Sequence, residues 1–75
     1  MFERFKNMLI DEFQVPPEKI TLEAELTGDL GINSIELAEL VYRCDDEFEI
    51  DIQEEDMHKF VTVGDVVEYL ENANK

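Results

Sequence analysis

Basic residues, cysteine and long apolar runs are all scarce in this chain, and each scarcity excludes a class of function. Only six of the 75 residues are Lys or Arg, against 20 Asp and Glu, so the formal net charge is −14. Binding to nucleic acids or to anionic membrane surfaces needs basic residues, so neither is expected as a partner. The acidic excess either favours protein partners with basic patches or only keeps the protein soluble.

The single cysteine, Cys44, excludes an internal disulfide and permits a reducing compartment. No apolar run approaches the length of a membrane span, and residues 1–6 lack the apolar core of a signal peptide. We therefore expect a cytoplasmic protein without membrane attachment, monomeric and folded as one small domain over residues 1–75.

Apolar residues at three-and-four spacing predict a first amphipathic helix, which Pro16 and Pro17 end. These residues are Phe2, Phe5, Met8, Leu9 and Phe13. The long connection from Glu18 to Gly28 follows, and we expect its apolar residues to pack into the helical bundle. They are Ile20, Leu22 and Leu26.

A second helix is predicted to begin near Ser34, with Asn33 as its N-cap and Glu36 completing a capping box. Its core stripe comprises Leu37, Leu40, Val41, Cys44 and Phe48. Residues 48–52 alternate between apolar and acidic, but a lone strand would have no partner. We interpret this segment as an extended connection held by its apolar residues.

The remaining pattern predicts a short helix around residues 54–59, with Met57 and Phe60 facing inward. Thr62 then caps a last helix, with Asp65 at the capping-box position. The buried stripe of that helix is Val63, Val66, Val67 and Leu70. The predicted fold is therefore all-α, a small bundle of three main helices plus one short helix.

Ser34 is the leading candidate site. It lies in the run Asp29-Leu30-Gly31-Ile32-Asn33-Ser34-Ile35-Glu36-Leu37. If Asn33 caps the helix, the Ser34 hydroxyl stays free, and Gly31 allows a modifying enzyme to approach closely. No catalytic partner lies nearby in the sequence, so modification fits this serine better than catalysis. The alternative is that Ser34 only helps to cap the helix.

The run around Ser34 resembles the 4'-phosphopantetheine attachment motif of acyl carrier proteins: a Leu-Gly pair, then an acidic residue, Ser and Leu. Asn33 stands in place of the acidic residue and Ile35 in place of Leu. The resemblance extends from the first helix through Val63-Gly64-Asp65-Val66-Val67. It implies an acyl-carrier fold and a covalent 4'-phosphopantetheine on Ser34 that carries acyl groups as thioesters. It also implies a phosphopantetheinyl transferase and acyl-processing enzymes as partners.

Four residues of the second helix, at spacings of four, three and four, share a face distinct from the core stripe. We call this set the docking face: Ile35, Glu39, Tyr42 and Asp46, flanked by Glu36 and Asp45. Exposed apolar residues among carboxylates suit the binding of enzymes with basic patches. The alternative is a solvated face with two incidental apolar residues. In the resembling family this helix is the usual recognition element.

Neither a catalytic nor a metal site is expected. Cys44 falls on the core face and precedes three acids, and His58, the only histidine, is expected on the surface. The acidic run from Asp45 to Asp56 fails as an EF-hand, because Ile50 stands where that loop requires Gly.

The sequence thus favours an acyl carrier in fatty-acid biosynthesis with separate enzymes, and not an enzyme itself. A specialised carrier for polyketide, lipid-modification or aminoacyl chemistry is one alternative. An unmodified acidic helical module that binds a basic protein is another, and it would not need the Ser34 hydroxyl.

Overall fold

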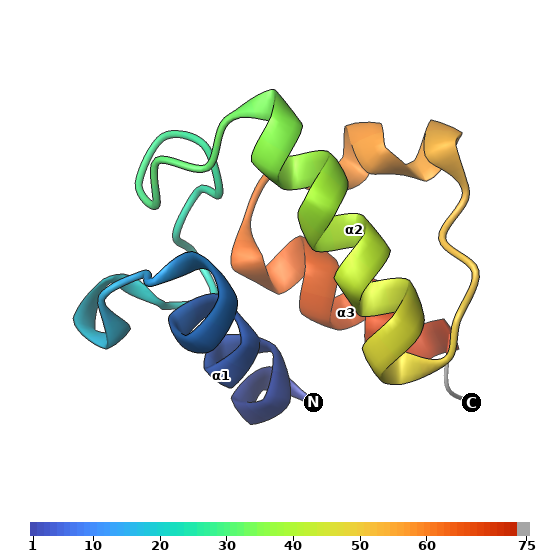
Figure 1. Cartoon of the computed structure of the whole chain (residues 1–75), viewed down its shortest axis with the longest axis horizontal. Coiled ribbons are helices and arrows are strands. Elements are labelled where there is room, and N and C mark those ends of the chain that lie inside the picture. The colour runs from blue at the N-terminus through green and yellow to red at the C-terminus, as the bar shows by residue number, and fades with distance from the viewer. Residues whose placement is uncertain (74–75) are drawn as a thin grey trace.

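Three α-helices and two short 3₁₀ helices form the protein, and the computed structural model describes residues 1–73. In chain order they are α1 (Phe2–Phe13), η1 (Pro17–Lys19), α2 (Ser34–Phe48), η2 (Glu54–Lys59) and α3 (Val63–Ala73). In Figure 1, α2 crosses in front of α3, and α1 lies to one side of this pair. The predicted all-α bundle of three main helices and one short helix is confirmed, and η1 is one further turn after the prolines.

The boundaries of α1 and α3 follow from local hydrogen bonding. Gln14 ends α1 in a left-handed conformation (φ 55°), and its N–H donates to the Ile10 carbonyl at 3.1 Å. At the start of α3, the Asp65 N–H donates to Thr62 Oγ1 at 3.2 Å, and the Thr62 N–H donates to Asp65 Oδ2 at 3.0 Å. The predicted capping box at Thr62 is therefore confirmed.

The segment 48–52 begins differently from the expectation. Phe48 is the last residue of α2 rather than part of an extended connection, and Glu49 ends the helix in a left-handed conformation. Phe48 lies four residues after Cys44 and continues the apolar stripe, so its burial prolongs the helix. Beyond it, Ile52 is buried, and its N–H donates to Asp45 Oδ1 at 3.0 Å, which ties this segment to α2.

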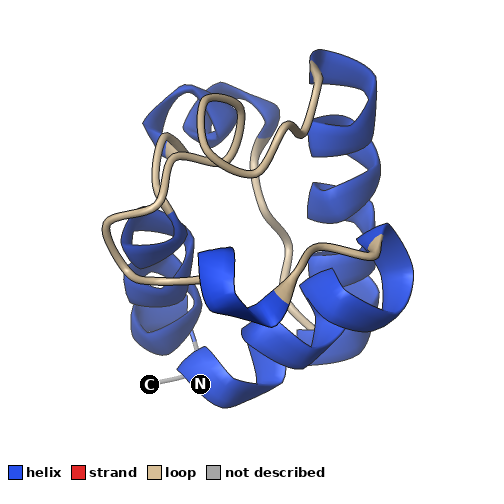
Figure 2. Ribbon diagram, turned by 90° about the vertical axis from the view of Figure 1, so that its left-hand side faces the viewer, coloured by secondary structure: helices blue, strands red, loops and turns tan. Residues whose placement is uncertain are grey.

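The long connection between α1 and α2 is anchored by Ile20 and Leu26, which are buried as predicted. The prediction for Leu22 was wrong, because its side chain is 48% exposed. Leu22 lies in a turn closed by the hydrogen bond from the Ala24 N–H to the Thr21 carbonyl at 3.2 Å, and a turn directs its side chain to solvent. The carbonyls of Leu22 and Ala24 accept from the Gly64 and Val63 N–H groups, respectively. The connection thus runs antiparallel to residues 61–64, on the side of the molecule that faces the viewer in Figure 2.

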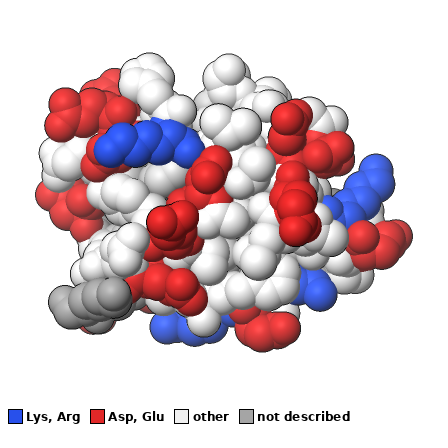
Figure 3. Space-filling model, turned by 180° about the vertical axis from the view of Figure 1, so that it is seen from behind, with Lys and Arg blue, Asp and Glu red and all other residues white. Residues whose placement is uncertain are grey.

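Acidic side chains spread over the surface, as the view from behind shows (Figure 3). Within residues 1–73, three basic side chains form four ion pairs: Arg4–Glu47, Arg43–Glu12, Arg43–Glu39 and Lys59–Asp56. No helix in this part of the chain is both long enough and apolar enough to cross a membrane.

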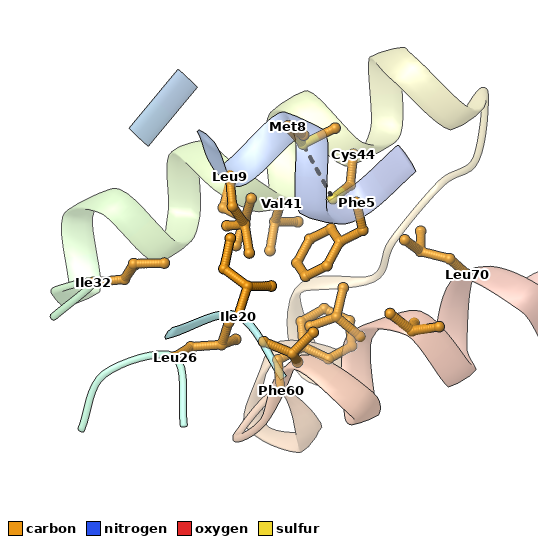
Figure 4. Close-up of a cluster of buried hydrophobic side chains, with 14 of the residues drawn as sticks. Phe5, Met8, Leu9, Ile20, Leu26, Ile32, Val41, Cys44, Phe60 and Leu70 are labelled. Atoms are coloured by element: carbon orange, nitrogen blue, oxygen red, sulfur yellow. Dashed lines mark hydrogen bonds between the residues drawn. The ribbon is translucent and has the colours of Figure 1, made fainter. Parts of the chain in front are cut away.

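One apolar cluster joins all three α-helices to the connecting segments (Figure 4). Phe5, Leu9, Leu26 and Leu70 are all fully shielded from solvent. Burying a side chain of this size contributes about 1.5–3 kcal/mol, so these contacts hold the bundle together. Some predicted core residues pack only at its edge and are partly buried: Phe2, Phe13, Leu37 and Met57.

Candidate functional site

Ser34 is the first residue of α2, and its side chain is exposed. The preceding turn passes through Gly31, whose φ of 71° is accessible to glycine at little cost. Ile32 anchors the turn: its side chain is 2% exposed, and its N–H donates to the Leu26 carbonyl at 2.9 Å. The turn is therefore anchored to the core, while the Ser34 that follows it is exposed to solvent.

Asn33, and not Ser34, caps α2. Its Oδ1 accepts from the Glu36 N–H at 2.8 Å, and Glu36 Oε1 accepts from the Asn33 N–H at 3.2 Å. This is the predicted capping box, and it is complete without the serine. Within residues 1–73, the Ser34 hydroxyl forms no hydrogen bond, so it is available for reaction.

The surroundings of Ser34 accommodate a large phosphate-linked group. At Gly31 no atom lies within 4 Å of where a Cβ would stand, so the approach is open. The start of a helix carries about half a positive charge, which favours a phosphate attached there. Ile35, the next residue, is 81% exposed and gives an apolar contact beside such a group. The residues present therefore fit a covalent phosphodiester.

The four residues of the docking face do lie exposed on one side of α2. Tyr42 is 78% exposed, and Glu39 and Asp46 are exposed beside it. Glu39 is not free, however, because its Oε1 lies 3.2 Å from Nη2 of Arg43. The Asp46 side chain has no ion pair or hydrogen bond among residues 1–73, so of these two carboxylates it is the more open to a partner.

The two flanking residues, Glu36 and Asp45, are only partly exposed, and each has a structural contact. Glu36 closes the capping box, and Asp45 accepts from the Ile52 N–H. Their carboxylates add negative charge next to the docking face, but part of their hydrogen-bonding capacity is already used.

Cys44 lies in the core, and His58 lies on the surface. Cys44 is 1% exposed, and its Sγ lies 4.0 Å from Met8 Sδ in the core. Burial, with a smaller contribution from the Asp45 charge, raises the pKa of the Cys44 thiol to about 12. His58 is exposed, as predicted. Among residues 1–73, no group of three or more His, Cys, Asp or Glu side chains is arranged to hold a metal ion.

Two interactions between elements escaped the sequence analysis. Arg43 links α2 to α1, because its Nη1 lies 3.2 Å from Glu12 Oε2. Its isolation as the only basic residue between Asp29 and Asp56 was the available clue. Tyr69 on α3 donates its hydroxyl to Asp56 Oδ2 on η2 at 3.0 Å, and no sequence spacing indicates that pair.

Comparison with known proteins agrees with this geometry. Residues 3–70 match the family model described as the phosphopantetheine attachment site. Curated acyl carrier proteins of three Clostridium perfringens strains (SM101, ATCC 13124 and 13) are each 40% identical to this chain over 70 residues. Each alignment covers 93% of this chain and 92% of the relative.

The match to the family model spans nearly the whole chain, and so does the similarity to the curated relatives. The prosthetic group of this family is covalent 4'-phosphopantetheine, and its partners are acyl chains and the enzymes that process them. The chain therefore belongs to the acyl carrier protein family, whose members are carriers and not enzymes.

Proposed function

We propose that Ser34 bears the 4'-phosphopantetheine and that the protein carries acyl intermediates of fatty-acid biosynthesis. The observation that carries this proposal is the exposed Ser34 hydroxyl, left without a hydrogen bond within residues 1–73 because Asn33 caps α2. In the same proposal the chain acts as one domain over residues 1–75 and as a cytoplasmic monomer. Light scattering of the purified protein tests the monomer, and a dimer mass would contradict it.

The chemistry at Ser34 is a transfer from coenzyme A. Ser34 Oγ loses its proton and forms a new bond to the phosphorus next to the pantetheine arm of coenzyme A. The P–O bond of the pyrophosphate breaks, and adenosine 3',5'-bisphosphate leaves with the bridging oxygen. When bound, the group supplies a terminal thiol that holds acyl chains as thioesters. The protein contributes an open approach at Gly31 and the positive end of α2 next to the phosphate.

The site assignment is tested by incubating the protein with coenzyme A and a phosphopantetheinyl transferase and measuring its intact mass. Ser34 is the only serine in the chain, so one addition is expected in the wild type and none in Ser34→Ala. Asn33→Asp restores the acidic residue usual in the family and keeps a capping side chain, so it should be modified as well. A mass gain in Ser34→Ala would place the attachment elsewhere, and no gain in the wild type would favour the unmodified acidic module.

The docking face is proposed as the surface that partner enzymes with basic patches bind. It lies on the helix that starts at Ser34, so an enzyme that reaches the prosthetic group also meets it. Exposed charges such as Asp46 steer the approach, while Ile35 and Tyr42 provide contact area. Glu36 and Asp45 contribute charge at the margin.

The pathway is proposed from the relatives, which are named acyl carrier proteins and which this chain covers over 92% of their length. Intact mass of the protein purified from its own cells tests it. Fatty-acid synthesis predicts bound acyl chains that differ by two-carbon steps. One fixed acyl or aminoacyl species would instead indicate a specialised carrier.

A further inference from the structure

A groove of about 360 Å³ separates α1 from α2 on the side of the docking face. α1 contributes Arg4, Asp11 and Glu12 to its walls. Arg43, Asp46 and Glu47 line it from α2. Arg43 and Asp46 also line the shallow depression beside Tyr42, so the groove is continuous with the docking face.

The two arginines of the groove are already paired. Nη1 of Arg43 lies 3.2 Å from Glu12 Oε2, and its Nη2 lies 3.2 Å from Glu39 Oε1. The Arg4 guanidinium lies 3.5 Å from Glu47 Oε1 and 4.8 Å from the centre of the Phe48 ring. Each arginine therefore has a carboxylate partner that neutralises it.

Two carboxylates remain, one on each wall. Asp11 on α1 and Asp46 on α2 are exposed, and within residues 1–73 neither side chain has an ion pair or a hydrogen bond. The groove thus has an excess of two negative charges, presented from opposite sides.

We propose that this groove receives one cationic side chain, a Lys or Arg, of the enzymes that bind the docking face. Partner recognition would then extend from α2 onto α1. The inference rests on the proposed function, because an enzyme must first approach α2 to reach Ser34. Charge complementarity and continuity with the docking face carry the argument.

The size and charge of the groove favour a Lys or Arg side chain over a cofactor, an anion or a metal ion. Its volume is at the lower end of the range for small-molecule pockets, about 300–1,000 Å³, so it accommodates a side chain better than a cofactor. An anion would meet two unpaired carboxylates and only paired arginines. A bound metal ion would need a cluster of ligands, and residues 1–73 contain none.

The test is Asp11→Asn, a nearly isosteric change on α1 that removes one groove charge and leaves α2 intact. The probe is the phosphopantetheinyl transferase with coenzyme A, and the readout is KM and kcat for modification of the carrier. Loss of one exposed cross-interface pair predicts that KM rises about two- to five-fold at low salt, with less effect at high salt. We expect kcat to stay unchanged, because Ser34 and its turn are untouched.

Glu3→Gln is the matched control, since it removes one exposed charge from the same helix outside the groove. Circular dichroism establishes that both variants are folded. If Asp11→Asn and Glu3→Gln change KM equally, the effect is one of net charge and the groove proposal is overturned. Ile35→Ala, within the docking face, should raise KM whether or not the groove is used, so it reports on docking separately.

A second measurement does not depend on kinetics. On addition of the transferase, backbone amide resonances of Asn7 and Asp11 should shift together with those of Tyr42 and Asp46. Shifts confined to α2 would overturn the groove proposal and leave the proposed function intact. Shifts of the α1 amides with MgCl2 alone, and none with transferase, would assign the groove to a metal ion and also overturn it. If wild-type protein gains no mass at all, both proposals fail.

Discussion

Within residues 1–73, three residues adopt the left-handed backbone conformation: Gly31, Gln14 and Glu49. Gly31 has the residue type that this conformation favours, and it lies in the turn that presents Ser34. Gln14 and Glu49 end α1 and α2 with φ of 55° and 54°, although both carry a Cβ. The glycine near the site is thus matched to its geometry, whereas the two helix ends are strained.

Replacing Glu49 by Gly should stabilise the protein. The left-handed conformation costs a residue with a Cβ about 1–2 kcal/mol, and Gly loses about 0.5–1 kcal/mol through its freedom in the unfolded chain. The difference, a net gain of about 0–1.5 kcal/mol, is measured by urea unfolding. Removing a negative charge from the C-terminal end of α2 adds a smaller gain.

Two further variants separate strain from charge. Glu49→Gln removes only the charge, and Gln14→Gly relieves only the strain. If Glu49→Gln stabilises as much as Glu49→Gly, and Gln14→Gly has no effect, strain at these helix ends is not the cause.

Residue-level predictions from the sequence succeeded where the interaction is local. Both capping boxes join residues three apart, Asn33 with Glu36 and Thr62 with Asp65, so their residue types suffice to identify them. The exposure of Leu22 could not be predicted in this way. It depends on the turn at residues 21–24, which a backbone hydrogen bond between Leu22 and Gly64, far along the chain, holds against the start of α3.

At the scale of elements, the position of η2 is held by a few individual contacts. It has no buried residue of its own, and it is held by the buried Ile52 before it and Phe60 after it. Tyr69 on α3 adds a hydrogen bond to Asp56 and an edge-to-face contact with Phe60, with ring centres 5.3 Å apart. The sequence predicts the position of η2 from its apolar residues, but not this connection to α3.

The Tyr69–Asp56 contact should make stability depend on pH at both extremes. The hydrogen bond from Tyr69, helped by Lys59, lowers the pKa of Asp56 below its ordinary 3.8. That contribution is present above pH 3.8 and is lost as pH falls through the lower, folded-state pKa. Partial burial and the hydrogen bond to Asp56 raise the pKa of Tyr69 above 10, so its contribution is lost as pH rises through that higher value.

Tyr69→Phe removes this hydrogen bond and keeps the aromatic contact with Phe60. We expect the variant to have a lower Tm than the wild type at neutral pH. The difference should shrink on both sides, below pH 3.8 and above pH 10. A Tm difference that stays constant across this range would show that the hydroxyl acts through packing and not through Asp56. Comparing the two proteins at each pH cancels the titration of the other acids.

At the scale of the whole molecule, the helical bundle could be predicted because each helix has a clear apolar stripe. Those stripes meet in one cluster that includes Phe5, Cys44, Val66 and Leu70. The crossing of α2 over α3 (Figure 1) and the groove between α1 and α2 could not be predicted. They depend on how the helices pack together and on Arg43 reaching Glu12, which periodicity within one helix does not encode.

The net charge should make the stability of the fold depend on salt, because 20 acids and six bases occupy a molecule of only 29 × 23 × 20 Å. At 0.01 M ionic strength the screening length is about 30 Å, so every charge acts on every other. At 0.1 M it falls to about 10 Å, and only neighbouring charges interact. Repulsion outweighs the four ion pairs described, so Tm should rise when NaCl increases over this range or when millimolar MgCl2 is added.

Repulsion among the acids is best tested by neutralising acidic side chains that form no other contact. Neutralising Asp45 or Glu47 also disturbs a contact, with the Ile52 N–H and with Arg4 respectively. Glu68 and Glu71 are exposed, lie one turn apart on α3, and have no ion pair within residues 1–73. The double change Glu68→Gln and Glu71→Gln should therefore raise Tm at 0.01 M salt and have a smaller effect at 0.1 M. A Tm gain of equal size at both salt concentrations would show that the amides stabilise α3 locally and that long-range repulsion does not limit stability.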